Sequence, residues 1–294
     1  MTRRGWILFA AMSVIWGLPY LLIKYAVDSL EPISVVAGRT GLAAVLLLPL
    51  AIRRGVLRPA LAQWRWLVAF TAIEMGGPFL LLSDAERVLP SGLTALLVGT
   101  VPLFGTVVAF GLGDRGALRP LRILGLLVGL AGVALIVSGS GDGGTVRAWN
   151  VVEVLLVAVG YAVAPFIAHR RLGDVPGLGL AAASVSLLAI VYVPIALTQQ
   201  HTAPTGKSIA ALVALALVCT AVAFVVFFAL IDEAGPARAT LITYVNPVIA
   251  LTLGVLVLDE SLTLGLLIGG PLVIAGCWLA ASHRDEDPVV VAEP

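Results

Sequence analysis

The sequence has 294 residues, of which 60% are hydrophobic and only 12% are charged, and its mean hydropathy is +1.07. Soluble domains carry about 25% charged residues, so water is excluded as the main solvent of this chain. The formal net charge is +1 and the 18 Lys and Arg residues are scattered among short loops, which argues against nucleic acid as a partner.

Apolar stretches long enough to cross a bilayer recur along almost the whole chain. A transmembrane helix needs about 20 residues to cross a hydrocarbon core of about 30 Å. Outer-membrane strands would instead alternate polar and apolar residues, which residues 123–140 do not. We therefore predict an all-α integral membrane fold of ten transmembrane helices, at residues 5–24, 32–52, 65–83, 91–112, 120–139, 149–169, 177–197, 207–231, 237–258 and 261–282.

The distribution of Lys and Arg predicts the orientation of these helices, because short cytoplasmic loops retain positive charge. With the N-terminus inside, 13 of the 18 fall in cytoplasmic segments, 4 fall outside, and Arg39 lies within a helix. We therefore expect a multi-pass protein of the bacterial inner membrane with both termini in the cytoplasm. Residues 285–294 are expected to form a disordered cytoplasmic tail.

The chain also contains a weak internal repeat. A shift of 145 residues aligns Thr94-Ala95-Leu96-Leu97, Pro102 and Asp114 with Ala239-Thr240-Leu241-Ile242, Pro247 and Asp259. Each half would hold five helices, an odd number, so the second half would enter the membrane from the opposite side. We predict two inverted five-helix repeats, at residues 1–144 and 145–284, an architecture that recurs in secondary transporters.

Several short motifs together carry a family resemblance that covers almost the whole chain. They are Trp16-Gly17 with Lys24, Arg39, Ser91-Gly92-Leu93-Thr94-Ala95, Pro102-Leu103-Phe104, Gly125 with Gly129 and Gly132, Tyr244-Val245-Asn246-Pro247-Val248, and Asp259-Glu260-Ser261-Leu262-Thr263. As a set they resemble the EamA-type family of the drug/metabolite transporter superfamily. The resemblance implies a ten-helix, inverted-repeat carrier of small metabolites, often an exporter of amino acids or related compounds. Two positions depart from the family pattern: Gly113-Asp114-Arg115 replaces Gly-Glu-Arg, and Tyr161 replaces a common Trp.

Glu74 is the most informative single residue, because it falls near the middle of a predicted span. An ionisable group there costs a few kcal/mol and marks a functional site by default. Thr71, Gly77 and Pro78 lie three or four residues away on the same helix face. Such a polar, kinked face suits a substrate or proton site, and a carboxylate held in a static ion pair is the alternative.

Arg39 lies about two turns inside the second predicted helix. Three roles are open for its guanidinium: binding a substrate carboxylate, pairing with Glu74, or anchoring the outer interface by extending toward it.

Two further polar patches lie within predicted spans. Trp16 and Tyr20 share a face of the first helix with Ser13 and Pro19, and the ninth helix carries Tyr244 and Asn246. Polar side chains in hydrocarbon need partners, so these residues line a cavity or bond to another helix. Pro102 and Pro247 occupy matched positions in the two halves and, with Pro78, are candidate hinges.

Small residues follow one face of the fifth and tenth helices and predict close helix packing or a subunit interface. They are Gly125, Gly129, Gly132, Gly265, Gly269 and Gly276.

These observations favour a secondary transporter. The expected partners are a small-molecule substrate, the lipid bilayer and a second copy of the chain in a homodimer. No phosphate-binding loop is present, so a solute or proton gradient is expected to drive transport. We expect no cofactor and no metal, since the three histidines lie at or beyond span ends. An intramembrane enzyme and a channel-like permease are the alternatives.

Overall fold

The computed structural model describes residues 1–114, 119–139 and 148–281. Within these ranges all regular elements are helical. Nine helices there are long and apolar enough to cross a membrane, and Ile242–Leu258 is a shorter apolar helix. The multi-pass, all-α fold is thereby confirmed. Arg115, Arg147, Arg284 and the predicted tail at 285–294 lie outside the described residues.

The first half of the chain supplies the first five predicted spans. Helices α1 (Arg3–Gly17) and α2 (Pro19–Ala26) form the first, and α3 (Pro32–Arg53) forms the second. After the short α4 (Leu57–Ala62), the third comprises α5 (Trp64–Thr71), the π-helix η1 (Ala72–Gly76) and α6 (Gly77–Ala85). Helices α7 (Ser91–Val98) and α8 (Val101–Gly111) form the fourth, and α9 (Pro120–Gly139) forms the fifth.

The second half of the chain is built from a similar series of helices. It contains α10 (Ala148–Arg171) and α11 (Gly177–Gln199), followed by the composite of α12 (Gly206–Ala216), the π-helix η3 (Leu217–Val222) and α13 (Ala223–Ala234). The short α14 (Pro236–Ala239), α15 (Ile242–Leu258) and α16 (Leu264–Ala281) complete it. The ninth predicted span, 237–258, is therefore divided into α14 and α15 rather than continuous.

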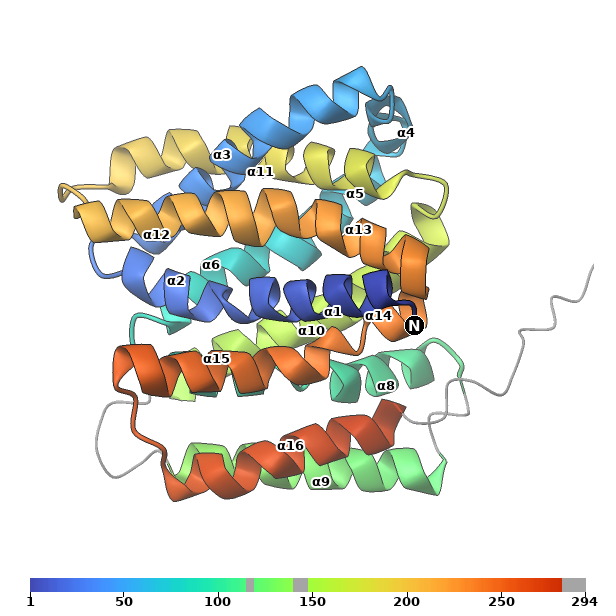
Figure 1. Ribbon diagram of the computed structural model, residues 1–294, viewed down its shortest axis with the longest axis vertical. Coiled ribbons are helices and arrows are strands. Elements are labelled where there is room, and N and C mark those ends of the chain that lie inside the picture. Colours follow the sequence, from blue (N-terminus) through green and yellow to red (C-terminus); the bar gives the residue numbers. More distant parts are fainter. Residues whose placement is uncertain (115–118, 140–147, 282–294) are drawn as a thin grey trace, which may run out of the picture.

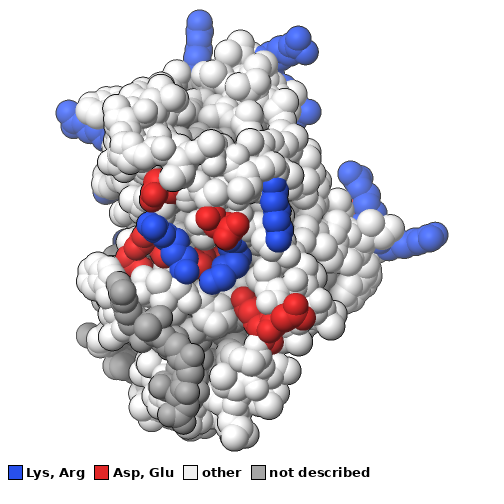
Figure 2. Space-filling model, turned by 90° about the vertical axis from the view of Figure 1, so that its left-hand side faces the viewer, with Lys and Arg blue, Asp and Glu red and all other residues white. Residues whose placement is uncertain are grey.

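The helices run back and forth between two faces of the molecule (Figure 1). The N-terminus and the last residues of α16 lie at the same face, on the right of the view. The opposite face carries the connections at 27–31, 86–90, 200–205 and 259–263, and we call it the charged face because Lys, Arg, Asp and Glu gather there (Figure 2). Helix α3 packs on α11, α1 on α15, α10 on α6 and α8, and α9 on α16.

Proline divides two of the spans that the sequence predicts as single helices. Pro19 and Pro102 each stand in the first turn of the second segment, after the breaks at Leu18 and at Gly99-Thr100. Because proline has no backbone N–H, the preceding turn loses a hydrogen bond, and the helix bends or ends there.

Each half contains one π-helix, in the third span of that half. Residues 72–76 and 217–222 begin 145 residues apart, which is the shift that aligns the sequence repeat. A π-turn accommodates an extra residue in the helix and frequently occurs at functional sites, because it exposes backbone groups and redirects side chains. The two segments carry Glu74 and Cys219, the residues that the sequence shift places opposite each other.

Glycine allows α9 and α16 to pack with their backbones in contact. A Cβ atom at Gly125 would lie 2.6 Å from the Gly276 carbonyl oxygen, and one at Gly269 would lie 2.5 Å from that of Gly132. A Cβ at Gly129 would instead meet the flexible end of the Leu103 side chain in α8. These contacts lie within one chain, where close approach of the helices strengthens van der Waals packing.

Replacing Gly269 with Leu is therefore expected to lower the folded yield strongly. Overpacking costs about 1–3 kcal/mol even where side chains can move, and here the new side chain meets backbone. The measurement is the fraction of protein that elutes as a single species after detergent extraction. Gly111→Leu is the matched control, because a Cβ at Gly111 has no neighbour within 4 Å. Equal yields for both variants would show that the glycines are not needed for packing.

The arrangement of the faces makes the predicted orientation testable with reporter fusions. Arg58 follows the end of α3 at the face of the termini, whereas Glu86 and Gly206 adjoin connections of the charged face. We expect cytoplasmic reporter activity after Arg58 and periplasmic activity after Glu86 and Gly206. The reverse pattern would contradict the positive-inside prediction. From the sequence we also expect cytoplasmic activity for fusions after Gly116 and Arg284 and periplasmic activity after Gly143. These three positions lie outside the described residues.

Candidate functional site

Arg39 lies in the interior of the helix bundle. Its exposed fraction is 7%, and its Nε donates a hydrogen bond to the Thr220 hydroxyl in η3 at 2.8 Å. The guanidinium carbon lies 3.7 Å from the centre of the Phe79 ring in α6, a cation–π contact. The side chain is thus held by two neighbouring spans, which argues against a role as an anchor at the membrane interface.

The π-helix η3 provides the hydrogen bond that positions this arginine. The Thr220 hydroxyl donates to the Leu215 carbonyl at 3.0 Å and accepts from Arg39 at the same time. Because the hydroxyl donates its one proton to Leu215 and accepts the Nε proton of Arg39, the rotamer of Thr220 is fixed, and with it the direction of the guanidinium.

Among the described residues, the terminal guanidinium nitrogens of Arg39 have no hydrogen-bond partner. The only hydrogen bond of this side chain there is the one from Nε to Thr220, and no carboxylate oxygen of the described residues lies within 4 Å of the guanidinium nitrogens. The static ion pair with Glu74 that the sequence left open is therefore absent. Two parallel N–H groups of this kind match the geometry of a carboxylate.

Glu74 occupies the middle of the π-helix η1. Its side chain is half-buried, and its Oε2 atom is buried without a hydrogen-bond partner in the described part of the chain. Helix α10 approaches η1 closely at Gly160, where a Cβ atom would lie 2.6 Å from the Ile73 carbonyl oxygen. This approach brings Tyr161 within electrostatic range of both Glu74 and Arg39.

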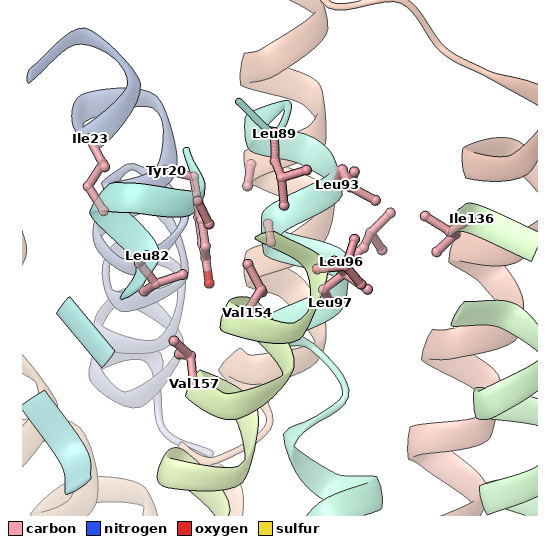
Figure 3. Close-up of a cluster of buried hydrophobic side chains, with 14 of the residues drawn as sticks. Tyr20, Ile23, Leu82, Leu89, Leu93, Leu96, Leu97, Ile136, Val154 and Val157 are labelled. Atoms are coloured by element: carbon pink, nitrogen blue, oxygen red, sulfur yellow. The ribbon is translucent and has the colours of Figure 1, made fainter. Parts of the chain in front are cut away.

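Tyr20 completes what we call the central polar cluster, defined as Tyr20, Arg39, Glu74 and Tyr161. Tyr20 is 9% exposed and lies within electrostatic range of Tyr161 and Arg39. Figure 3 shows its side chain directed between Leu82, Val154 and Val157. The four residues come from α2, α3, η1 and α10, so the cluster combines both halves of the chain. Tyr161 was not predicted as a site residue from the sequence, although a tyrosine within a span needs a partner.

The other predicted site residues make contacts between helices away from this cluster. The Thr71 hydroxyl donates to Ser184 of α11 at 2.8 Å, and the Trp16 ring packs on Phe227 of α13, with the ring centroids 4.7 Å apart. The predicted site residues on α15, Tyr244 and Asn246, also contact other helices. The Tyr244 hydroxyl donates to the Cys277 carbonyl at 3.3 Å. With the Asn246 amide oriented so that its nitrogen faces the neighbouring acceptors, this nitrogen donates to the carbonyls of Ile242 and Ser13 at 3.0 and 3.1 Å.

The three candidate hinge prolines all lie beside interruptions or tight contacts. Pro78 stands in the first turn of α6, directly after η1, and Pro102 stands in the first turn of α8. Pro247 is inside α15, and its ring contacts Gly99, where a Cβ atom would lie 3.2 Å from Pro247 Cγ. The break in the fourth span thus packs directly on the proline of the ninth, although hinge motion stays a prediction.

At the charged face, hydrogen bonds connect segments that are distant in sequence. Lys24 Nζ donates to the carbonyls of Glu86 and Leu89, at 2.8 Å each. The Glu260 carboxylate accepts from the backbone N–H groups of Ser91 and Gly92, at 2.6 and 3.1 Å. Since these N–H groups begin helix α7, Glu260 acts as its N-terminal cap from the other half of the chain. The two halves are thereby joined at this end.

Comparison with known proteins identifies relatives along the whole chain. The sequence profile of the EamA-like transporter family matches residues 3–138 and again 148–282. An uncharacterized inner membrane transporter of Escherichia coli K12, YedA, is 29% identical over 262 residues, which cover 86% of this chain and 82% of the relative. A probable terminal-alkyne amino-acid exporter of Streptantibioticus cattleyicolor is 28% identical, over 95% of this chain and 93% of the relative.

A solved crystal structure also has a similar fold. It aligns with a TM-score of 0.63 at 23% sequence identity, over 96% of this chain and 98% of the solved chain.

Proposed function

The chain belongs to the EamA-like transporter family and is a multi-pass membrane transporter, and we propose that it exports small metabolites that carry both a carboxylate and an amino group, by alternating access. The observation that carries this proposal is Arg39, a buried guanidinium whose terminal nitrogens have no carboxylate partner among the described residues. Amino acids and closely related compounds have the required chemistry.

The energetics of burial support a charged substrate group at Arg39. Burying a cation inside a membrane-spanning helix bundle costs free energy unless an anion or hydrogen-bond acceptors surround it. The protein supplies one hydroxyl and one aromatic ring, so a substrate carboxylate would add the missing charge. The unpartnered Oε2 of Glu74, in the same cluster, would accept a hydrogen bond from the substrate amino group.

Several observations support alternating access between two inverted halves, with boundaries at 1–144 and 145–284. The family profile matches twice, and the two π-helices begin 145 residues apart. The helix contacts also correspond under this shift, since the first span packs on the ninth as the sixth packs on the fourth. Transporters of this architecture bind substrate between the repeats, and the central polar cluster, whose residues come from both halves of the chain, would supply such a site.

The direction of transport is supported by a relative. The Streptantibioticus protein is named as a probable exporter of terminal-alkyne amino acids. We extend the direction and the substrate class, but not the alkyne, to this chain.

An efflux measurement tests the substrate class. Cells that overproduce the chain are compared with cells that produce Arg39→Gln at the same membrane level, and metabolites in the medium are quantified by mass spectrometry. We expect compounds with both an amino group and a carboxylate to accumulate outside only with the native chain. Accumulation dominated by compounds without a carboxylate, or identical media for both strains, would contradict the proposal.

A further inference from the structure

A second buried acid, Glu86, lies outside the central polar cluster. It is the first residue after α6, in the connection to α7 at the charged face. Its side chain is nevertheless 0% exposed, and neither carboxyl oxygen has a hydrogen-bond partner within the described residues. An acid in a connection between helices is normally hydrated, whereas Glu86 is buried without a hydrogen-bond partner among the described residues. The protonation state of Glu86 therefore has to be considered.

The charged and titratable groups around Glu86 do not neutralise it. From α2, Lys24 points its ammonium at the backbone carbonyls of Glu86 and Leu89, and within the described ranges no carboxylate oxygen lies within 4 Å of this ammonium. Tyr20, also from α2, and Glu260, from the connection after α15, lie within electrostatic range.

The remaining charges near this segment are engaged with one another. Arg87 lies 3.7 Å from Asp84 and 3.4 Å from Glu31, and all three side chains are more than two-fifths exposed. Glu153 of α10 interacts with Asp84 and accepts a hydrogen bond from Asn150. None of these contacts provides a donor to the Glu86 carboxyl.

An ionised carboxylate buried without a well-formed hydrogen bond is strongly disfavoured, so the acid is stable here in its neutral form. Burial raises the pKa of Glu86 well above its ordinary range, the ammonium and the backbone N–H of Lys24 oppose this rise in part, and the negative Glu260 adds to it. When the same side chain is hydrated, its pKa returns to about 4.3 and it ionises at neutral pH.

Contacts beside Glu86 hold the charged face together. Lys24, from the same half, binds the backbone of Glu86 itself, and the Glu260 cap on α7 holds the second half against the segment that follows. If the halves separated at this face, as alternating access requires, water would reach the carboxyl. We propose that Glu86 is a proton-binding site whose occupation is required for the charged face to close.

This inference rests on the proposed alternating access. The direction of the pH effect on closure follows from the linkage between proton binding and the conformational equilibrium. Closing the face takes up one proton from the water at that face, and opening it releases the proton. At pH values between the ordinary pKa of the hydrated acid and its raised pKa in the closed state, the ratio of closed to open molecules rises by up to about tenfold for each pH unit that the pH falls. Above the raised pKa the protonated, closed form is lost.

The test measures the opening of the charged face directly and needs no substrate. Spin labels are attached at Asp28→Cys and Leu262→Cys, two exposed positions on connections of this face from different halves. Cys219 and Cys277 are buried, so labelling is confined to the introduced thiols. Pulsed electron spin resonance then gives the distance distribution in lipid nanodiscs from pH 5 to pH 8.

We expect the short-distance population of the native background to grow several-fold as the pH falls. Glu86→Gln, a neutral isostere of the protonated acid, should give the short distance at every pH. Glu31→Gln, an exposed acid of the same face, is the matched control and should respond to pH as the native background does. Glu86→Asp should retain a pH response.

Two results would overturn the proton site: distances in the native background that do not change with pH, or a pH response in Glu86→Gln equal to the native one. The native pH series decides the matter even if Glu86→Gln fails to fold. Because no substrate is present, a negative result here together with intact metabolite efflux would remove the proton site and leave the proposed transport standing.

Discussion

Replacing Glu74 with Gln is expected to abolish net transport while leaving the protein folded. Gln has the size of Glu and can still accept a hydrogen bond, but it lacks the negative charge that would pair with a substrate ammonium. Hydrogen bonds to charged groups contribute about 1.5–3 kcal/mol, so loss of the carboxylate corresponds to roughly a tenfold or greater loss of affinity. Because Glu74 Oε2 has no partner among the described residues, the substitution breaks no protein contact of this atom. Initial rates of labelled substrate transport in proteoliposomes measure the effect.

Glu74→Asp is the matched variant, because it keeps the charge on a shorter side chain, and it should retain part of the activity. Folding of each variant is checked by its elution profile and thermal unfolding, since a change at a buried acid could alter transport by destabilising the protein. If Glu74→Gln folds and transports at the native rate across the pH range, Glu74 is structural and does not bind substrate.

Replacing Arg39 with Lys is expected to raise the KM for substrate by about 10–100-fold, although the positive charge is retained. Lysine cannot form the planar, bidentate contact with a carboxylate, and it also loses the Nε bond to Thr220 that aims the side chain. A loss of about 1.4 kcal/mol in binding corresponds to each tenfold change. The concentration dependence of transport separates KM from the maximal rate.

Two further variants serve as comparisons for Arg39→Lys. Thr220→Val removes the hydroxyl that positions Arg39 without removing the guanidinium, so its KM should lie between those of the native protein and Arg39→Lys. Arg53→Gln, at the exposed end of α3, should leave the KM unchanged. An unchanged KM in Arg39→Lys would show that Arg39 stabilises the helix bundle rather than the substrate.

Most of the fold could be predicted from the sequence because the bilayer imposes a strong constraint. Each span must be apolar over about 20 residues, and charge marks the connections. The breaks before Pro19 and Pro102 follow from the missing proline N–H and were also accessible. The π-helices were not, because one extra residue in a turn leaves no signature in an apolar sequence.

The candidate site was predictable only where a residue is costly in its position. Arg39 and Glu74 stand out because charge is expensive within a span. Tyr244 and Asn246 look similar in the sequence whether they line a cavity or connect helices, and the structure gives them helix partners. Glu86 was not singled out from the sequence, because its burial and its nearness to Lys24 and Glu260 arise only when folding brings distant segments together.

Counterflow in proteoliposomes tests most directly whether the chain is an alternating-access carrier of amino- and carboxylate-bearing metabolites. Vesicles containing the purified protein are loaded with a high concentration of unlabelled amino acid and diluted into labelled amino acid, with no ion gradient. A carrier with one site accessible alternately from each side should accumulate label transiently above its outside concentration, and the initial rate should saturate with substrate. Label that only equilibrates at a rate proportional to concentration would indicate a channel-like permease, and recovery of a chemically altered amino acid would indicate an enzyme; either result would contradict the carrier mechanism.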